Sequence, residues 1–229
     1  MKKVTTLALL CAFSVSGANA ANEINVKGKI VPPACTVNFA KGSDDLDWGN
    51  IPHNSLSATQ FTILPKKEAS LTVTCDGETA MSFTVSDPYK ATAIAGMRVG
   101  SGYANGDDAN RIFGLGLDPV SKQKIGNFTL IGTGSSYDDI RNDKSFGVKS
   151  ATDISTQGFT THLFSEHWGI PVTEKWTILK KDINIGEAAK GKVLTFDFDV
   201  VPQLNIISKI TATEEVNFKG TAQFTVSYF

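Results

Sequence analysis

The sequence predicts an all-β protein, a sandwich of antiparallel strands with Greek-key connections. Several short stretches alternate apolar and polar side chains with a period of two, which is the pattern of a half-buried strand. The chain has 20 glycines and many serines and threonines, and this composition favours strands and turns over a helical bundle. A chain of 229 residues can bury one full core, so we expect a single domain over residues 21–229.

The first 20 residues have the features of a secretory signal peptide. Lys2 and Lys3 precede an apolar run over residues 7–13, and small residues follow up to Ala20, which is the order found in cleavable export signals. The apolar run is too short to span a bilayer. We therefore expect residues 1–20 to be removed on export. The remaining chain is slightly acidic, which argues against a nucleic-acid partner.

The residues before the first cysteine of the exported chain predict a strand. One face of that strand carries Ile24, Val26, Gly28 and Ile30. The pair Pro32–Pro33 ends it. The six residues 21–26 at the start of the exported chain reach roughly 20 Å when extended, about one strand. Residues 24–30 can therefore pair within their own domain or be donated to a neighbouring chain, but hardly both.

Two cysteines remain after removal of the signal peptide, Cys35 and Cys75. An even pair in an exported chain predicts a disulfide. Closing a loop of roughly 40 residues removes about 4 kcal/mol of unfolded-state entropy in the chain model. Cys75 ends an alternating stretch that begins at Leu71, and Asp76–Gly77 predicts a tight hairpin turn into a strand over residues 81–85.

The middle of the chain mixes strands with polar segments. Residues 35–67 are rich in turn formers, with Trp48 and Phe61 as expected core anchors. Residues 112–117 and 126–131 predict two strands across a polar turn, and we expect the long loops of the domain within residues 96–168. Further strands are predicted over 176–179 and 193–201, with short ones over 205–210 and 216–218.

The last ten residues predict a strand with one apolar face. That face carries Ala222, Phe224, Val226 and Tyr228. A strand here, with no hairpin partner after it, must pair elsewhere in the fold or with another chain. If it pairs within the fold, it is an ordinary strand that completes a closed sandwich.

No catalytic or metal motif emerges, so we expect no enzyme, no cofactor and no metal site. His162 and His167 lack the i, i+4 spacing of a zinc-binding helix. The oxygen-rich residues 105–110 lack the closing glutamate of a calcium loop. The carboxylate pairs 44–45 and 138–139 lie in turn-like contexts where charges are normally hydrated.

Three tryptophans leave a second kind of function open. Trp48, Trp168 and Trp176 offer aromatic faces on which a sugar could stack, although single tryptophans in β-domains are more often core anchors. The alternative function is therefore a carbohydrate-binding adhesin module.

Taken in order, these motifs resemble those of fimbrial (pilus) subunits of the chaperone–usher pathway. The resemblance is carried by VKGKIVPPAC over residues 26–35, LTVTC over residues 71–75, and an alternating C-terminal strand with Tyr228 in the penultimate position. FGLGL over 113–117 and KIG over 124–126 look like a poorly characterised fimbrial-like branch. The likeness covers essentially the whole exported chain.

The resemblance implies an immunoglobulin-like (pilin-type) Greek-key sandwich that lacks its final strand. The missing strand would leave an apolar groove, filled first by a periplasmic chaperone and then by the N-terminal extension of a neighbouring subunit. The residues implied to line the groove and contact the chaperone are Ala222, Phe224, Val226 and Tyr228. The carboxylate of Phe229 would anchor in the chaperone cleft.

The same resemblance implies the partners and the location. The subunit would pass through the periplasm and an outer-membrane usher, and would then contribute to pilus formation and adhesion in a fimbrium on the cell surface. The alternatives are a carbohydrate-binding module at the fimbrial tip, with a host or surface glycan as partner, and a self-contained periplasmic sandwich outside any fibre.

Overall fold

The computed structural model describes residues 26–31, 33–94, 109–155, 158–164, 169–181 and 186–229. The chain divides into two units, residues 1–32 and residues 33–229. The predicted signal peptide, Ile24, the acidic residues at 107–108, His167 and Trp168 lie outside the described residues.

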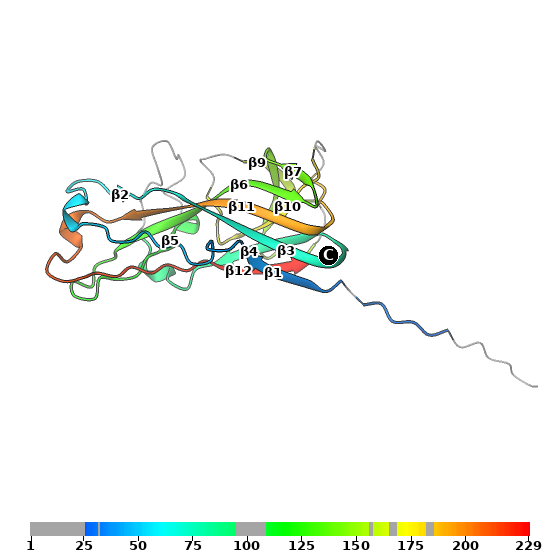
Figure 1. Cartoon of the computed structure of the whole chain (residues 1–229), viewed down its shortest axis with the longest axis horizontal. Coiled ribbons are helices and arrows are strands. Elements are labelled where there is room, and N and C mark those ends of the chain that lie inside the picture. The colour runs from blue at the N-terminus through cyan, green and yellow to red at the C-terminus, as the bar shows by residue number, and fades with distance from the viewer. Residues whose placement is uncertain (1–25, 32, 95–108, 156–157, 165–168, 182–185) are drawn as a thin grey trace, which may run out of the picture. The chain divides into compact units, whose positions relative to one another are not determined.

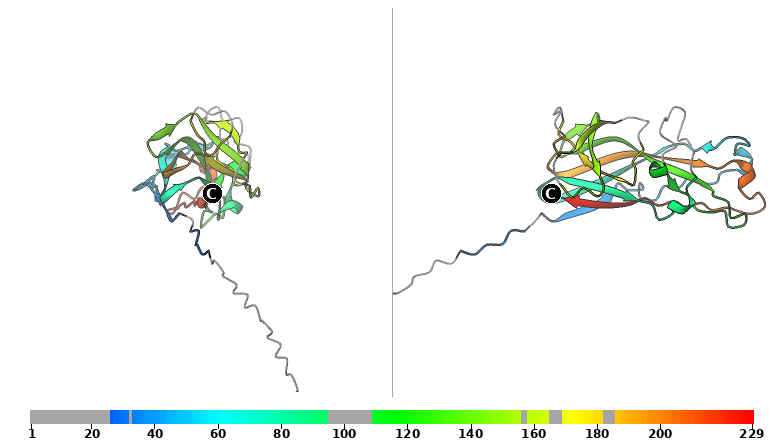
Figure 2. Two further views of the ribbon diagram at one scale, coloured as in Figure 1. Left: turned by 90° about the vertical axis from the view of Figure 1, so that its right-hand side faces the viewer. Right: turned by 180° about the vertical axis from the view of Figure 1, so that it is seen from behind.

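Residues 33–229 form an all-β, immunoglobulin-like sandwich of two antiparallel sheets (Figures 1 and 2), as predicted. The seven-stranded sheet has the order β1 (Cys35–Phe39), β3 (Lys67–Thr79), β11 (Gly191–Leu204), β6 (Gly126–Tyr137) and β5 (Phe113–Gly114), with β2 (Thr62–Ile63) on β11 and β7 (Ile140–Asn142) on β6. The five-stranded sheet has the order β12 (Gln223–Tyr228), β4 (Met81–Ser86), β10 (Glu174–Ile178), β8 (Ser145–Ser150) and β9 (Thr160–Leu163). Short 3-10 turns stand at His53–Ser55, Lys90–Thr92, Ala109–Arg111 and Ile207–Lys209.

Alternation along the strands explains how the two sheets face each other. In β3, Leu71 and Val73 are fully buried while Thr72 between them is half-exposed. In β11, Phe196 and Phe198 are buried in the same way. Large rings join the sheets: Phe83 of β4 meets Phe196 of β11 at a centroid distance of 5.0 Å. Burying these apolar faces against each other is the main term that stabilises such a sandwich.

The predicted hairpin after Cys75 is wrong. β3 continues through Asp76 and Gly77 to Thr79, and the chain then enters β4, which belongs to the other sheet. The backbone N–H of Asp76 donates to the carbonyl of Ala34 at 3.0 Å, and the carboxylate of Asp76 accepts from the N–H of Ala34 at 2.9 Å. Because both bonds hold Asp76 in line with the start of β1, the chain turns only after residue 79.

Three other expectations about secondary structure need correction. Residues 26–31 form no strand, and Val26 and Ile30 are 92% and 99% exposed, so the strand predicted before Cys35 is not formed. The range 96–168, where long loops are expected, holds more strands than the two predicted there, because its described part also contains the end of β6 and all of β7, β8 and β9. Residues 205–210 hold a 3-10 turn and residues 216–218 hold no strand, since no neighbouring strand pairs with them.

One edge of the sandwich positions the candidate site. Among the described strands, β1 pairs with β3 alone and β12 pairs with β4 alone. These two edge strands run side by side in Figure 1 and in the rear view of Figure 2, and Phe39 of β1 contacts Phe224 of β12 at 5.4 Å between ring centroids. Each strand therefore keeps one hydrogen-bonding edge free at the same side of the fold.

Candidate strand-acceptor groove

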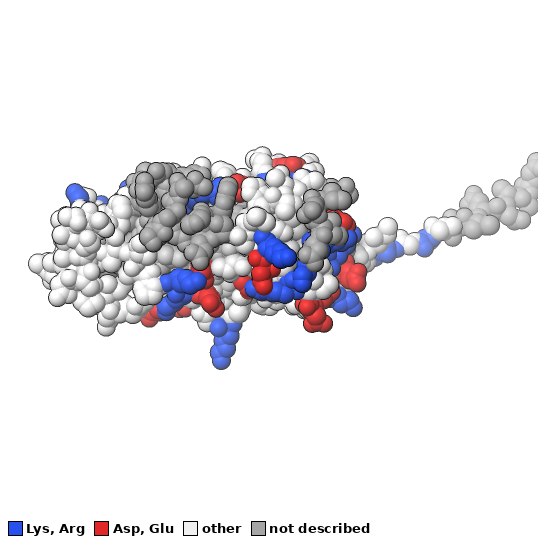
Figure 3. All heavy atoms as spheres, turned by 90° about the horizontal axis from the view of Figure 1, so that it is seen from above, with Lys and Arg blue, Asp and Glu red and all other residues white. Residues whose placement is uncertain are grey.

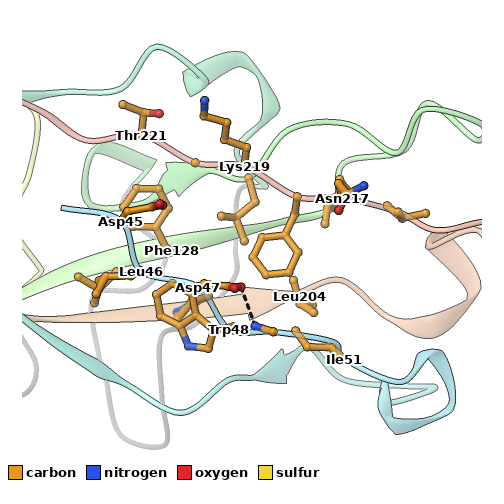
Figure 4. A pocket seen from close by; sticks show the side chains of 18 of the residues that line it. Asp45, Leu46, Asp47, Trp48, Ile51, Phe128, Leu204, Asn217, Lys219 and Thr221 are labelled. Carbon is orange, nitrogen blue, oxygen red and sulfur yellow. Dashed lines mark hydrogen bonds between the residues drawn. The ribbon is translucent and has the colours of Figure 1, made fainter. Parts of the chain in front are cut away.

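The candidate site is a groove of about 1050 Å³ that opens at this edge of the sandwich. One wall is the segment 43–51, which follows β1, and the other is the segment 214–222, which leads into β12. Figure 4 shows the two walls on opposite sides, with Phe128 and Leu204 between them. The site thus lies along the direction of the two edge strands.

Apolar side chains of the large sheet and its flanking loops form the floor of the groove. They are Leu115, Ile125, Phe128, Leu130, Phe198, Val200 and Leu204. All of them are buried. The floor is therefore continuous with the core of the sandwich.

The wall before β12 continues the alternation of that strand. Its half-buried side chains Val216, Phe218 and Ala222 face the core, while Asn217 and Lys219 between them are exposed. In β12 itself Phe224 packs on Phe198 at 5.3 Å and on Phe83 at 5.6 Å between centroids. The side chains of residues 216–222 alternate as they do in a strand, but this segment is not hydrogen-bonded into either sheet.

The other wall repeats the same pattern. Leu46, Trp48 and Ile51 are half-buried against the core, and Asp45 and Asp47 on either side of Leu46 are exposed. The indole N–H of Trp48 donates to the carbonyl of Pro65 at 2.7 Å. This contact ties the wall to the segment just before β3.

The two walls do not pair with each other. No backbone hydrogen bond joins residues 43–51 to residues 214–222, all of which the structure describes. The backbone bond that anchors the second wall runs from the N–H of Lys219 to the carbonyl of Leu115, at 3.2 Å. A few backbone groups of the walls bond locally, as the N–H of Gly49 does to the carboxylate of Asp47 at 2.7 Å. The others are left for water or for an inserted strand.

Free apolar surface continues along the edge beyond the groove. Val37 of β1 lies in register with the fully buried Val73 and therefore on the core-facing side, yet it is 41% exposed. Tyr228 at the end of β12 is also 41% exposed. Burial of the remaining part raises the pKa of the Tyr228 hydroxyl.

A buried carboxylate fixes the start of the second wall. Asp118 is fully buried and accepts hydrogen bonds from the backbone N–H groups of Val120 and Ser121, at 2.8 and 2.9 Å. It also accepts from the N–H and the hydroxyl of Thr211, at 2.6 and 2.9 Å. Burial alone would raise the pKa of Asp118, but these hydrogen bonds outweigh it and hold the pKa well below its ordinary value.

One glycine is required where the second wall crosses the floor. A Cβ at Gly220 would lie 2.5 Å from the ring of Phe128 and 2.9 Å from the carbonyl oxygen of Gly114. The Phe128 ring cannot move away easily, because it is buried and stacked on Phe113 at 5.0 Å. Only glycine lets the wall approach the floor this closely.

Several sequence-predicted residues meet near this edge. Cys35 and Cys75 form the predicted disulfide, in register across β1 and β3. Phe224 and Ala222 line the groove, whereas Val226 and Tyr228 lie further along β12. The backbone of Phe229 exchanges hydrogen bonds of 3.0 Å with Ala80, so this residue is held at the β3–β4 corner.

The other candidate residues do not converge on a site. Trp176 is 1% exposed and stacks on Phe146 in the core, so it cannot stack on a sugar. His162 also packs against the Phe146 ring. His53 is half-buried, with Nε2 3.0 Å from the carbonyl of Ile210. Asp138 accepts from the N–H groups of residues 192 and 193, which is a structural role in a turn.

The described residues contain no group of three or more His, Cys, Asp or Glu side chains placed to hold a metal ion. They also contain no helix long and apolar enough to cross a membrane.

Sequence reasoning missed half of the groove. For the segment 43–51 the sequence predicts only part of a turn-rich stretch, with Trp48 as a core anchor. Its signal was the alternation of apolar and acidic residues from Asp45 to Trp48, which is too short to identify a strand-like wall by itself. The floor residues could not be predicted as a group, because the sequence does not show which strands lie next to each other.

The match to a known protein family spans the N-terminal part of the residues that form this site. A family model described as "Protein of unknown function (DUF1120)" matches residues 24–129. This match includes both cysteines, the wall 43–51 and the floor residues up to Phe128. No curated protein matches the chain.

Proposed function

We propose that this protein is an exported, fimbrial-type structural subunit whose sandwich is completed by a strand from another chain. A periplasmic chaperone fills the groove first, and a neighbouring subunit replaces it at an outer-membrane usher, which leads to pilus formation and adhesion. The protein acts by noncovalent strand addition, without turnover and without a cofactor.

One observation carries the proposal: the two walls of the groove present strand-like apolar faces and yet have no backbone bonds to each other. In strand addition, backbone hydrogen bonds give affinity and pockets for alternate side chains give specificity. We infer that the free edges of β1 and β12, which carry the exposed Val37 and Tyr228, supply both requirements. An inserted strand would also cover edges that otherwise invite aggregation.

The test is expression of the chain in the periplasm with and without the chaperone of its own system. We expect a one-to-one complex with the chaperone, and degradation or aggregation without it. A stable, folded monomer in the absence of any chaperone would contradict the proposal and favour a closed sandwich. Electron microscopy of cells that express the whole system would then show whether the protein enters fibres.

Substitutions along the edge make the test specific. Phe224→Glu together with Tyr228→Glu places charge on the groove side of β12 and should abolish chaperone capture. Thr225→Glu with Ser227→Glu, on the exposed side of the same strand, is the matched control and should retain it. Because Phe224 also packs in the core, Val37→Glu on the opposite edge provides a second variant with less effect on folding.

A further inference from the structure

The end of the sandwich that carries β2 has few charged side chains. Three segments meet there, over residues 52–63, 117–125 and 205–213. The backbone N–H of Ile207 donates to the carbonyl of Ser57 at 2.9 Å, and the side-chain amide of Asn205 donates to the carbonyl of Lys124, also at 2.9 Å. Figure 1 shows β2 at this end and the C-terminus at the other. In Figure 3 the β2 end is almost free of charged side chains, whereas both signs of charge gather toward the other end.

The exposed charge of these three segments is positive. Their charged side chains are Asp118, Lys122, Lys124 and Lys209. Asp118 is fully buried, whereas the three lysines are exposed. Lys122 and Lys124 donate to neutral backbone carbonyls, at 2.6 and 2.7 Å, and none of the three lysines forms an ion pair in the described part of the chain. The acidic residues 214–215, which follow in the chain, line the groove instead.

Exposed apolar side chains lie within the same positive end. Leu117 and Val120 are 47% and 50% exposed, and Pro119 between them is exposed as well. They belong to the hairpin that joins β5 to β6, in which Leu117 bridges to Lys124. Turns are normally built from Gly, Pro, Asn, Asp and Ser, so two branched aliphatic side chains at the end of a hairpin call for a physical reason.

The fold holds this hairpin in one conformation. The buried carboxylate of Asp118 accepts from the N–H of Val120 and from Thr211, as described above. Across the hairpin, the N–H of Asp118 donates to the carbonyl of Gln123 at 2.8 Å, and the N–H of Lys122 donates to the carbonyl of Asp118 at 3.0 Å. Lys122 has a φ of 59°, a left-handed conformation that lysine adopts at a cost. These bonds therefore keep the aliphatic side chains in their exposed positions.

Lysines beside exposed aliphatic side chains match the interface of an anionic bilayer. Lysines are attracted to the lipid phosphates, and aliphatic side chains gain free energy by entering the boundary between headgroups and acyl chains. A soluble polyanion would engage the lysines and leave the aliphatic side chains in water. The three segments contain no Trp or Tyr, the side chains whose large amphipathic faces suit a sugar ring.

We propose that the hairpin over residues 117–124, together with Lys209, is a contact site for an anionic lipid bilayer. Lys209 lies beside the hairpin, because the hydroxyl of Ser121 donates to its carbonyl at 3.4 Å. The two aliphatic side chains enter the interface and the three lysines contact lipid phosphates. None of these residues lines the groove, so the inference goes beyond the proposed function and does not depend on it.

The test measures co-sedimentation of the protein with lipid vesicles at low salt. The protein is the form that periplasmic expression yields, either the free chain or its complex with the chaperone, and the chaperone alone is measured beside it. The vesicles contain phosphatidylcholine alone or mixed with phosphatidylglycerol. We expect binding to the mixed vesicles only, and its loss at about 0.5 M salt, where the Debye length is about 4 Å.

Substitutions separate the two parts of the contact. Lys122→Gln, Lys124→Gln and Lys209→Gln together should weaken binding on the order of 100-fold, because each lysine near an anionic surface contributes about fivefold. Leu117→Ser with Val120→Ser should weaken it about tenfold, since about half of each side chain is still exposed before binding.

Matched controls lie near the start of β11, at the other end of that strand. Lys181→Gln, Lys190→Gln and Lys192→Gln remove the same charge from exposed positions. Ile140→Ser with Val193→Ser removes two aliphatic side chains that are 44% and 40% exposed. Both control variants should bind the mixed vesicles as wild type does.

A dye locates the contact without weakening it. Val120→Cys, labelled with an environment-sensitive dye, should increase its emission when mixed vesicles are added. The same dye on Val193→Cys should not respond. This readout does not require that the lysine variants fold.

Each opposite result overturns the inference. Absence of binding, equal binding to both kinds of vesicle, or equal weakening by the control lysine variant would each do so, as would a dye response at residue 193 but not at residue 120. Binding to soluble dextran sulfate but not to vesicles would overturn the bilayer as the partner. None of these results bears on the groove, whose own test is capture by the chaperone.

Discussion

Replacing Asp118 by asparagine should loosen the wall of the groove from its start. The carboxylate accepts three hydrogen bonds at Oδ1 and one at Oδ2. Asparagine can keep its carbonyl toward the three donors, but its NH₂ group then faces the backbone N–H of Thr211, donor against donor. Loss of this charge-assisted bond and weakening of the others should lower the free energy of unfolding by about 3 kcal/mol at pH 7.

The contribution of Asp118 to the free energy of unfolding should fall as the pH is lowered. Since the pKa of Asp118 is depressed in the folded protein, its contribution is fully present above the unfolded-state pKa of about 3.9 and falls as the pH drops below it. The variant has no such group. The stability difference between wild type and Asp118→Asn should therefore be constant from pH 5 to pH 7 and should shrink below about pH 4.

The assay is urea denaturation of both proteins at several pH values, followed by tryptophan fluorescence. Asp139→Asn is the control, because this carboxylate is exposed, and its effect should stay within about 0.5 kcal/mol. If Asp118→Asn is as stable as wild type at pH 7, the four hydrogen bonds do not hold the wall and the reasoning is refuted. A difference that grows on acidification would equally contradict it.

Three further substitutions test the groove and its frame. Phe224→Ala removes a half-buried ring packed on three others at 5.3 to 5.6 Å and should lower the unfolding free energy by about 2–3 kcal/mol, whereas the exposed Thr225→Ala should change it by less than about 0.5 kcal/mol. Replacing Cys35 and Cys75 by serine should cost about 4 kcal/mol in the chain-entropy model, and a reductant that lowers the melting temperature of wild type should not affect this variant. Gly220→Val forces the wall away from the floor and should cost about 1–3 kcal/mol; an unchanged melting temperature would show that the close approach at residue 220 is not needed.

Local pattern determined the strands and their faces. Period-two alternation identified β3, β4, β10, β11 and β12, because side chains in a strand point to opposite sides in turn. It also identified which side is buried, as Leu71 and Phe196 confirm. The cysteine count of the exported chain predicted the Cys35–Cys75 bond, since an even pair in such a chain normally closes.

Tertiary structure alone decided which strands became neighbours. Alternation states which face is buried but not which strand lies beside it, so β3 and β4 were predicted as a hairpin although they lie in different sheets. The clamp between Asp118 and Thr211 joins residues 93 apart in the chain, and no local pattern marks such a pair. The groove likewise exists only because two distant segments, 43–51 and 214–222, flank one floor and lack a strand between them. The sequence by itself determined the strands and the disulfide of this protein, and long-range packing determined its open edge.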